Sequence, residues 1–155
     1  MNATVNAFFL ILKLLSLYFL VVSLFSLCKR KMQKSSTTQR RFAVLIAARN
    51  EESCIAGLIE SLLAQNYPSE LFDIWALPNN CTDHTADAAR HAGGKVLEMP
   101  TSIHSKGAAL QYAANTLLHG SRYYDAFCVF DADNEVDPAF LSEMNQALSR
   151  SAIVK

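Results

Sequence analysis

From residue 42 onward, short apolar runs alternate with segments in which apolar residues recur at helical spacing. An uninterrupted apolar run of this length is typical of a strand that is buried on both faces. Strands are predicted in this way at residues 42–48, 72–77, 95–99 and 124–130. Each run is followed by a stretch of helical character, so the order strand–helix occurs four times. This alternation predicts an α/β fold with a mostly parallel sheet and flanking helices.

The predicted helices begin and end at residues with known capping roles. Asn50, Thr82 and Asp137 each precede a helical stretch, and their side chains can accept hydrogen bonds from its first turn. Gly93-Gly94 ends the second helix, because glycine is favoured just after a helix. The third helix is expected at about residues 106–118.

A polar cluster follows each of the four predicted strands. The clusters are Arg49-Asn50-Glu51-Glu52, Asn79-Asn80-Cys81-Thr82-Asp83, Ser102 with His104-Ser105-Lys106-Gly107, and Asp131-Ala132-Asp133-Asn134. The carboxyl ends of parallel strands meet at one edge of a sheet, and ligands bind beyond that edge. The sequence therefore predicts a binding site built from all four clusters.

Asp131 and Asp133 are the most informative pair in these clusters. Side chains two apart on an extended chain point to the same side, so the two carboxylates can converge on one object. Their oxygen atoms suit Mg²⁺ or Mn²⁺, and such ions commonly carry the phosphates of a substrate. A plain acidic turn before the next helix is the alternative. The position of the pair among four clusters on one edge favours a metal–diphosphate site.

The first part of the chain has a different character. Residues 5–28 are almost wholly apolar and long enough to span a bilayer as a helix. The charged residues that follow, up to Arg41, are all basic, which places that flank in the cytoplasm. A cleaved signal peptide fits less well, because no basic residue precedes the apolar stretch. We expect a single-pass membrane protein whose remaining chain is cytoplasmic.

The domain organisation follows from these patterns. A transmembrane helix is predicted at residues 5–28, a basic polar linker at 29–41 and one domain at 42–155. The four cysteines form no CxxC pair, which suits reduced thiols in the cytosol. The net charge is zero. We expect the membrane as a partner and no nucleic acid.

The four clusters also resemble the motifs of family 2 glycosyltransferases, in order and over about residues 43–147. Ala47-Ala48-Arg49-Asn50-Glu51-Glu52 resembles the family's AxNEE opening, and Asn79-Asn80-Cys81-Thr82-Asp83 its second nucleotide loop. Ser105-Lys106-Gly107 resembles its lysine–glycine segment, and Phe130-Asp131-Ala132-Asp133 its DxD motif. The resemblance implies a GT-A (Rossmann-like) fold, of which this chain carries the half that binds the nucleotide-sugar. The implied reaction is metal-dependent, inverting transfer of a sugar from a nucleotide-diphospho-sugar, usually UDP-linked, to a glycan, lipid or other acceptor.

The resemblance also implies roles for individual residues. Ala48, Asn50 and Glu52 would line the uridine pocket, and Asn79 would face the base. Lys106 would lie near the ribose or the phosphates. Asp131 would contact the ribose or the metal, and Asp133 would ligate Mg²⁺ or Mn²⁺.

The catalytic base is not assigned to any residue of the chain. In the family it lies in an acidic motif well beyond the DxD, so it is expected beyond Lys155, as is the acceptor site. The alternative hypothesis is a truncated, non-catalytic, membrane-anchored protein that binds a nucleotide or a partner. The acceptor and the sugar are not identified by the sequence.

Other readings of the same residues fit less well. A calcium loop starting at Asp131 would need glycine at Val136 and glutamate at Ser142. A dinucleotide-binding domain would need a GxGxxG turn after the first strand. A nucleotidyltransferase typically has a glycine-rich first loop, which is absent here. Trp75 is expected in the core, and His104 is a weaker candidate for contact with the ligand.

Overall fold

The computed structural model describes residues 3–27 and 38–150. The chain divides into two units, Met1–Lys34 and Ser35–Lys155. The predicted linker at residues 29–41 therefore lies mostly outside the described residues. The first unit contains α1 (Ala3–Leu27), whose large side chains, such as Phe8, are exposed.

The structure does not support the predicted transmembrane helix at residues 5–28. A helix does form there, as α1. Within residues 3–27 and 38–150, however, no helix is long and apolar enough to cross a membrane.

The second unit is built on a parallel sheet of four strands in the order β3-β2-β1-β4. The strands are β1 (Phe42–Ala48), β2 (Phe72–Pro78), β3 (Lys95–Val96) and β4 (Ala126–Asp131). In the register, Ala48 lies opposite Pro78 and Ala47 lies opposite Asp131. The carboxyl ends of β1, β2 and β4 therefore meet at one edge, as the sequence predicts.

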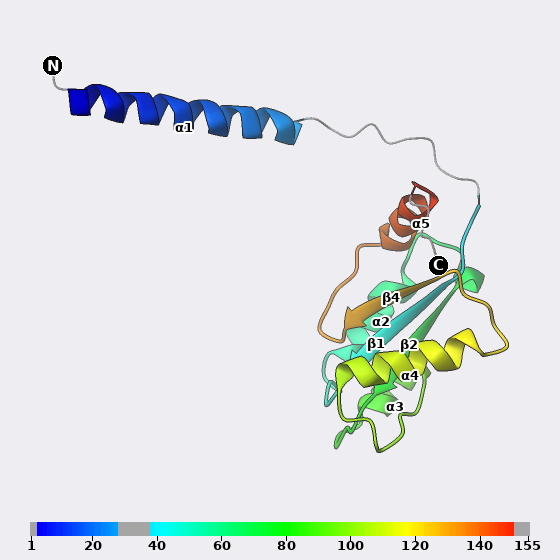
Figure 1. Ribbon diagram of the computed structural model, residues 1–155. Coiled ribbons are helices and arrows are strands. Elements are labelled where there is room, and N and C mark those ends of the chain that lie inside the picture. The colour runs from blue at the N-terminus through cyan, green and yellow to red at the C-terminus, as the bar shows by residue number, and fades with distance from the viewer. Residues whose placement is uncertain (1–2, 28–37, 151–155) are drawn as a thin grey trace. The chain divides into compact units, whose positions relative to one another are not determined.

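Helices cover both faces of this sheet (Figure 1). They are α2 (Ile55–Leu63), α3 (Thr85–His91), α4 (Lys106–Leu118) and α5 (Phe140–Arg150), with a short 3₁₀ helix η1 (Ser69–Leu71) before β2. Val44 and Ile46 of β1 pack with α2, α3 and α5, whereas Ala43 and Leu45 pack with α4. Alternate residues of β1 thus enter two separate cores, which explains why this strand is apolar throughout. The predicted α/β class with flanking helices is confirmed.

Several element boundaries differ from the prediction. α2 begins at Ile55 with Cys54 at its N-cap, so Asn50 does not cap it. α5 begins at Phe140 and not directly after Asp137, and β4 spans Ala126–Asp131 instead of residues 124–130.

The second helix begins at Thr85 and not after Thr82, because the backbone N–H groups of Thr82 and His84 bind Asn50 and Glu52 from the preceding loop. The third strand is limited to Lys95–Val96 instead of residues 95–99. One further bond, from Leu97 N to Ala76 O, continues its pairing.

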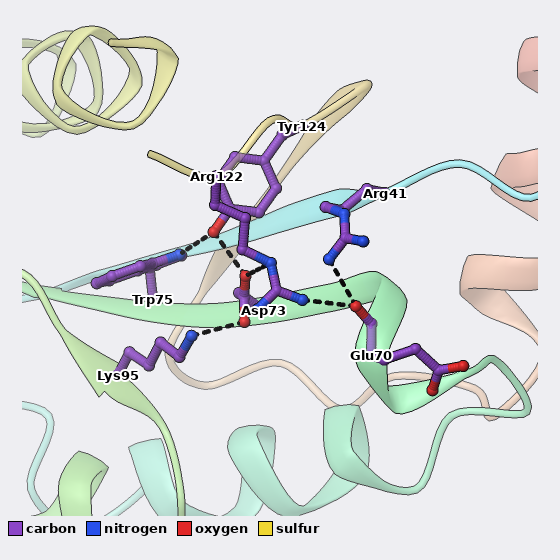
Figure 2. Close-up of polar contacts among 7 residues, drawn as sticks. All are labelled: Arg41, Glu70, Asp73, Trp75, Lys95, Arg122 and Tyr124. Carbon is purple, nitrogen blue, oxygen red and sulfur yellow. Dashed lines mark hydrogen bonds and ion pairs between the residues drawn. The ribbon is translucent and has the colours of Figure 1, made fainter. Parts of the chain in front are cut away.

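At the amino-terminal end of the strands, a buried carboxylate holds several elements together (Figure 2). Asp73, only 7% exposed, accepts hydrogen bonds from Lys95 Nζ at 2.7 Å and Tyr124 Oη at 2.6 Å. Arg122 Nε lies 3.0 Å from Asp73 Oδ2. Trp75 Nε1 donates to Tyr124 Oη at 3.3 Å, and Lys95 Nζ lies 5.4 Å from the centre of the Trp75 ring. The indole packs beside the core that α4 covers, as predicted for Trp75.

This contact network affects the protonation of its members. Burial by itself raises the pKa of Asp73, but the hydrogen bonds from Lys95 and Tyr124 and the charges of Lys95 and Arg122 outweigh it, so the pKa is lowered. Burial, followed by the hydrogen bond to Asp73, raises the pKa of Tyr124 to about 12. Asp73 is therefore the charged acceptor of the network and Tyr124 a neutral hydroxyl.

Candidate functional site

A cavity of about 390 Å³ opens at the carboxyl edge of the sheet. It is lined by residues from all four loops that follow the strands. They are Ala47, Ala48, Arg49, Glu51, Leu77, Asn79, His104, Lys106, Ala109, Asp131, Ala132 and Asp133. The structure therefore brings the four polar clusters of the sequence together around one hollow. Among the predicted site residues, Ala48, Asn79, Lys106, Asp131 and Asp133 lie in its wall.

The two aspartates of the fourth cluster flank a buried alanine. Ala132 is 3% exposed, while Asp131 and Asp133 are exposed and line the same cavity. The turn is closed by two hydrogen bonds between Asp131 and Asn134: Asp131 N donates to Asn134 Oδ1 at 2.9 Å, and Asn134 N donates to Asp131 O at 3.1 Å. Both aspartates thus line the cavity from a braced turn.

Lys106 stands beside this pair. Its Nζ forms an ion pair with Asp131 Oδ1, and the two side chains are 52% and 59% exposed. Ser105 caps α4 by accepting a hydrogen bond from Ala108 N at 3.2 Å, which places Lys106 at the first position of the helix. A lysine and two carboxylates therefore share one solvent-accessible space.

The carboxylates suit a divalent ion that a ligand helps to hold. Within residues 3–27 and 38–150, no group of three or more His, Cys, Asp or Glu side chains is placed to bind a metal without other ligands. Mg²⁺ is often bound by one or two carboxylates together with waters and the phosphates of a substrate. Asp131 and Asp133 fit that arrangement. Among the described residues, Asp131 forms an ion pair with Lys106, whereas Asp133 forms none.

Asn50 and Glu52 make contacts of another kind. Asn50 Oδ1 accepts a hydrogen bond from Thr82 N at 2.8 Å, and Glu52 Oε2 accepts one from His84 N at 3.0 Å. Glu52 N donates in turn to Asp83 Oδ2 at 3.2 Å. These bonds join the loop after β1 to the loop after β2. The predicted roles of Asn50 and Glu52 toward a ligand stay predictions.

Asp83 completes the join between the two loops. Its Oδ1 accepts hydrogen bonds from Thr85 Oγ1 at 2.5 Å and Thr85 N at 3.1 Å. The hydrogen bond from the Thr85 hydroxyl, together with backbone N–H groups, lowers the pKa of Asp83. Thr85 Oγ1 also accepts a bond from Glu51 N at 2.9 Å.

Arg49 and Glu51 line the cavity although the sequence reasoning did not select them. An extended chain would place residues 48, 50 and 52 on one side. Asn50, however, has φ +59°, a left-handed conformation that turns the chain and brings its two neighbours to the cavity wall. Asparagine adopts this conformation more readily than most residues. The asparagine at position 50 was therefore the one sequence signal that could have predicted this turn.

Glu51 also has a protein contact, with Cys54. The Cys54 thiol donates to Glu51 Oε2 at 3.0 Å. This hydrogen bond, with burial and the negative charges of Glu51 and Asp133, raises the pKa of Cys54 to about 11. Cys54 is therefore a neutral thiol and not a nucleophile at physiological pH.

The loop after β2 carries a second left-handed asparagine. Asn80 has φ +51°, and its Nδ2 donates to Asn79 Oδ1 at 2.9 Å and to Ile103 O at 2.6 Å. Ile103 precedes His104, which lines the cavity. Asn80 thus connects the second and third loops, and this connection was not visible in the sequence pattern.

Comparison with solved structures supports the fold assignment. Mannosyltransferase PcManGT from Pyrobaculum calidifontis, solved with GDP-Man and Mn²⁺, matches with a TM-score of 0.66 and 17% identity over 84% of this chain and 39% of that one. S. aureus TarS 1-349 matches with a TM-score of 0.59 and 20% identity over 71% of this chain and 32% of that one. These likenesses define a GT-A-like α/β protein.

A third structure and a curated relative are also similar. Glucosyl-3-phosphoglycerate synthase from Mycobacterium tuberculosis, in complex with Mn²⁺, UDP and glucosyl-3-phosphoglycerate, has a TM-score of 0.52 and 22% identity over 66% of this chain and 37% of that one. Beta-monoglucosyldiacylglycerol synthase of Nostoc sp. (strain PCC 7120 / SAG 25.82 / UTEX 2576) is 40% identical over 43 residues, which are 28% of this chain and 9% of the relative. The chain thus spans much less than two thirds of the length of these proteins.

The family is shown by the sequence itself. Residues 43–154, most of the chain, match the family Glycosyl transferase family 2. The chain therefore belongs to glycosyl transferase family 2, as its four polar clusters led us to expect.

Proposed function

We propose that the protein formed by this chain transfers a sugar from a nucleotide-diphospho-sugar, with UDP as the nucleotide, to a glycan, lipid or other acceptor. The observation that carries this proposal is the convergence of Lys106, Asp131 and Asp133 in one cavity at the carboxyl edge of a parallel sheet. Such an edge is where α/β proteins of this kind bind ligands. Two structural neighbours, solved with GDP-Man and Mn²⁺ or with UDP and Mn²⁺, support it.

The residues of the cavity suit the charge that the reaction develops. Breaking the bond between sugar and phosphate leaves a diphosphate with growing negative charge. Lys106 can stabilise that charge through its ammonium group. Asp131 and Asp133 would hold Mg²⁺ or Mn²⁺. When bound, this ion would act as a Lewis acid toward the diphosphate.

The uncharged part of the wall suits the nucleoside. Ala48 and Leu77 offer a small apolar surface, and Asn79 offers an amide beside it. We further propose that the reaction inverts the configuration at the anomeric carbon of the sugar. A carboxylate base would assist it by taking the proton of the acceptor hydroxyl. We assign that base to no residue of this chain.

Calorimetry with UDP in the presence and absence of Mn²⁺ tests the proposed site. We expect binding that depends on the metal, and Asp133→Asn should weaken it at least tenfold, because one ligand of the metal loses its charge. Glu135→Gln is the matched control: this exposed carboxylate lies two residues away and does not line the cavity. A folded chain that binds no UDP with Mn²⁺, or equal losses in the two variants, would refute the proposal.

A transfer assay separates the proposal from its alternative. Sugar transfer from a UDP-sugar by the 155-residue chain would exclude the non-catalytic hypothesis. Nucleotide binding without transfer would favour a protein that binds a nucleotide or a partner and performs no chemistry. Hydrolysis of the UDP-sugar alone does not separate the two, because water needs no acceptor site.

We also propose that the protein works at a membrane, with the unit Ser35–Lys155 on the cytoplasmic side. Phe8, Phe9 and Leu10 of α1 are each more than half exposed, and a large exposed apolar surface marks a site that binds a membrane or another protein. The basic residues between α1 and β1 favour the cytoplasmic face. Cell fractionation followed by protease protection tests this: we expect a membrane-bound chain whose family 2 unit is cleaved from the cytoplasmic side.

A further inference from the structure

The two most exposed large apolar side chains among the described residues of the unit Ser35–Lys155 lie in one short connection. They are Leu118, the last residue of α4, and Tyr123, three residues before β4, with exposed fractions of 61% and 68%. Lys106, at the other end of α4, lines the cavity and lies about 18 Å from Leu118 along the helix axis. The two apolar side chains therefore lie at the end of the unit opposite the candidate site.

Two arginine side chains converge at the same end (Figure 2). Arg41 Nη1 and Arg122 Nη2 both donate to the backbone carbonyl of Glu70, at 2.7 Å and 2.5 Å. Because both bonds end on one oxygen atom, two positive charges are held close together. Guanidinium groups bind phosphate well, since their N–H groups match its oxygen atoms. A phosphate group that contacts both arginines would relieve their mutual repulsion.

The chain that enters β1 adds positive charge to this end. Residues 29–41 include six basic residues and no acidic one, and Arg41 directly precedes β1. Arg41 N donates to Asp125 Oδ2 at 2.7 Å, and Asp125 N donates to Arg41 O at 2.8 Å. These bonds join the basic entry to the connection that carries Tyr123. The basic residues outnumber the two exposed acids of this end, Glu70 and Asp125.

We propose that this end of the unit binds an anionic lipid surface. Leu118 and Tyr123 enter the headgroup layer, and Arg41 and Arg122 contact the lipid phosphates. Exposed apolar and aromatic side chains beside basic ones are typical of protein surfaces that lie in a membrane interface. The inference rests on the proposed association of the chain with a membrane, and it adds which surface of the family 2 unit touches the lipid.

A lipid surface fits these residues better than a protein partner does. Two apolar side chains cover less area than a stable interface between proteins buries. A membrane needs less, because a small apolar anchor and basic residues suffice when a second signal also holds the chain there. The exposed apolar side chains of α1 provide that second signal.

Quenching of fluorescence by brominated lipids tests the contact. The full chain is bound to vesicles of phosphatidylglycerol and phosphatidylcholine, with bromine on the phosphatidylcholine near the glycerol end of its acyl chains. Tyr123→Trp should be quenched severalfold more strongly than Tyr112→Trp, which makes the same exchange at an exposed tyrosine in the middle of α4. Trp75, the tryptophan of the wild type, gives a background that both variants share.

Two further measurements separate the apolar anchor from the charge. In the Tyr123→Trp chain, Leu118→Ser should reduce the quenching severalfold, because the second apolar side chain is lost. Vesicles of phosphatidylcholine alone should reduce it as well, because they offer no net negative charge to the arginines. Urea unfolding in detergent should be unchanged by Leu118→Ser, since this side chain is mostly exposed.

The outcomes separate this inference from the proposed membrane association. A chain that does not float with the vesicles would refute both. A chain that floats, with equal quenching of Tyr123→Trp and Tyr112→Trp, would refute the inference alone and leave this surface to a protein partner. Equal quenching with and without phosphatidylglycerol would also refute it. Strong quenching of Tyr123→Trp that needs the anionic lipid and falls with Leu118→Ser supports it.

Discussion

At the scale of single residues, two lysine–aspartate pairs of similar chemistry sit in very different surroundings. In the pair Lys106–Asp131, both side chains are more than half exposed and line the cavity. In the pair Lys95–Asp73, the aspartate side chain is 6% exposed and lies at the other end of the strands. Exposed ion pairs contribute about 0–1 kcal/mol to stability, whereas breaking a buried pair costs more. The first pair is therefore available for binding and the second stabilises the fold.

This contrast gives a prediction with an internal control. Lys106→Met should lower the affinity for UDP with Mn²⁺ at least fivefold, and should shift the free energy of unfolding by no more than about 1 kcal/mol. Lys95→Met should do the opposite and reduce stability with little effect on UDP binding. Calorimetry and urea unfolding of both variants check the pattern. A Lys106→Met chain that loses stability and keeps its affinity would contradict it.

The candidate site was predictable where polar residues follow the carboxyl ends of the predicted strands. Ala48, Asn79, Lys106, Asp131 and Asp133 reach the cavity as expected, because each lies at or near the carboxyl edge of the sheet. Arg49 and Glu51 were missed, since their placement depends on the left-handed Asn50 and not on a periodic pattern. A backbone dihedral at one residue cannot be read from hydrophobic spacing.

At the scale of elements, the glycines in α2 and directly after α3 differ in whether another residue could replace them. A Cβ added at Gly57, an exposed position inside α2, would meet nothing within 4 Å. Gly93, which follows α3, has φ +94° and lies against Leu63 of α2. At Gly94, a Cβ would come within 2.9 Å of Ile59 Cδ1 and 3.1 Å of Ala89 O. Helix α3 can therefore end close to α2 only because these two positions lack side chains.

Alanine substitutions at Gly57 and Gly93 should change the free energy of unfolding in opposite directions. Gly57→Ala should raise the free energy of unfolding by about 0.5–1 kcal/mol, because alanine has the higher helix propensity. Gly93→Ala should lower it by about 1 kcal/mol or more, since the left-handed conformation is strained for alanine. Thermal or urea unfolding of the two variants measures both effects. Stabilisation by Gly93→Ala would mean that this turn tolerates a side chain.

The elements themselves were largely predictable, and one of the exceptions has a clear cause. β1, α2 and α4 match the expected positions, because each shows an apolar run or stripe of sufficient length. The start of α3 shifts because Asn50 and Glu52 bind the backbone N–H groups that Thr82 and His84 would otherwise use in a helix. Contacts between loops that are distant in sequence leave no periodic signal.

At the scale of the whole molecule, Asp73 joins β2, β3 and the segment that leads into β4 (Figure 2). Its pKa is lowered in the folded chain, so the folded state binds the proton of this group less readily than the unfolded state does. The stabilisation from its contacts is therefore complete above the usual pKa of about 3.9 and is lost as the pH falls through the lowered value.

The pH dependence of unfolding tests this linkage. Asp73→Asn should cost on the order of 2 kcal/mol at neutral pH, because it leaves Lys95 and Arg122 without their carboxylate. The difference in unfolding free energy between the wild type and Asp73→Asn should be constant above about pH 5 and should shrink below about pH 4. Urea unfolding at a series of pH values measures it. A difference that does not change with pH would show that the charge of Asp73 is unimportant.

The strand order also has a consequence for the time at which the site forms during synthesis. β4 pairs with β1, so Asp131 joins the sheet only after α2, β2, α3, β3 and α4 have emerged from the ribosome. Before β4 docks, the chain can form the Arg49 and Asn79 side of the cavity, but Asp131 and Asp133 are missing from it. A nascent chain thus lacks both aspartates of the proposed metal–nucleotide site until β4 docks. Once β4 has docked, a complex that binds there would favour the docked strand by mass action.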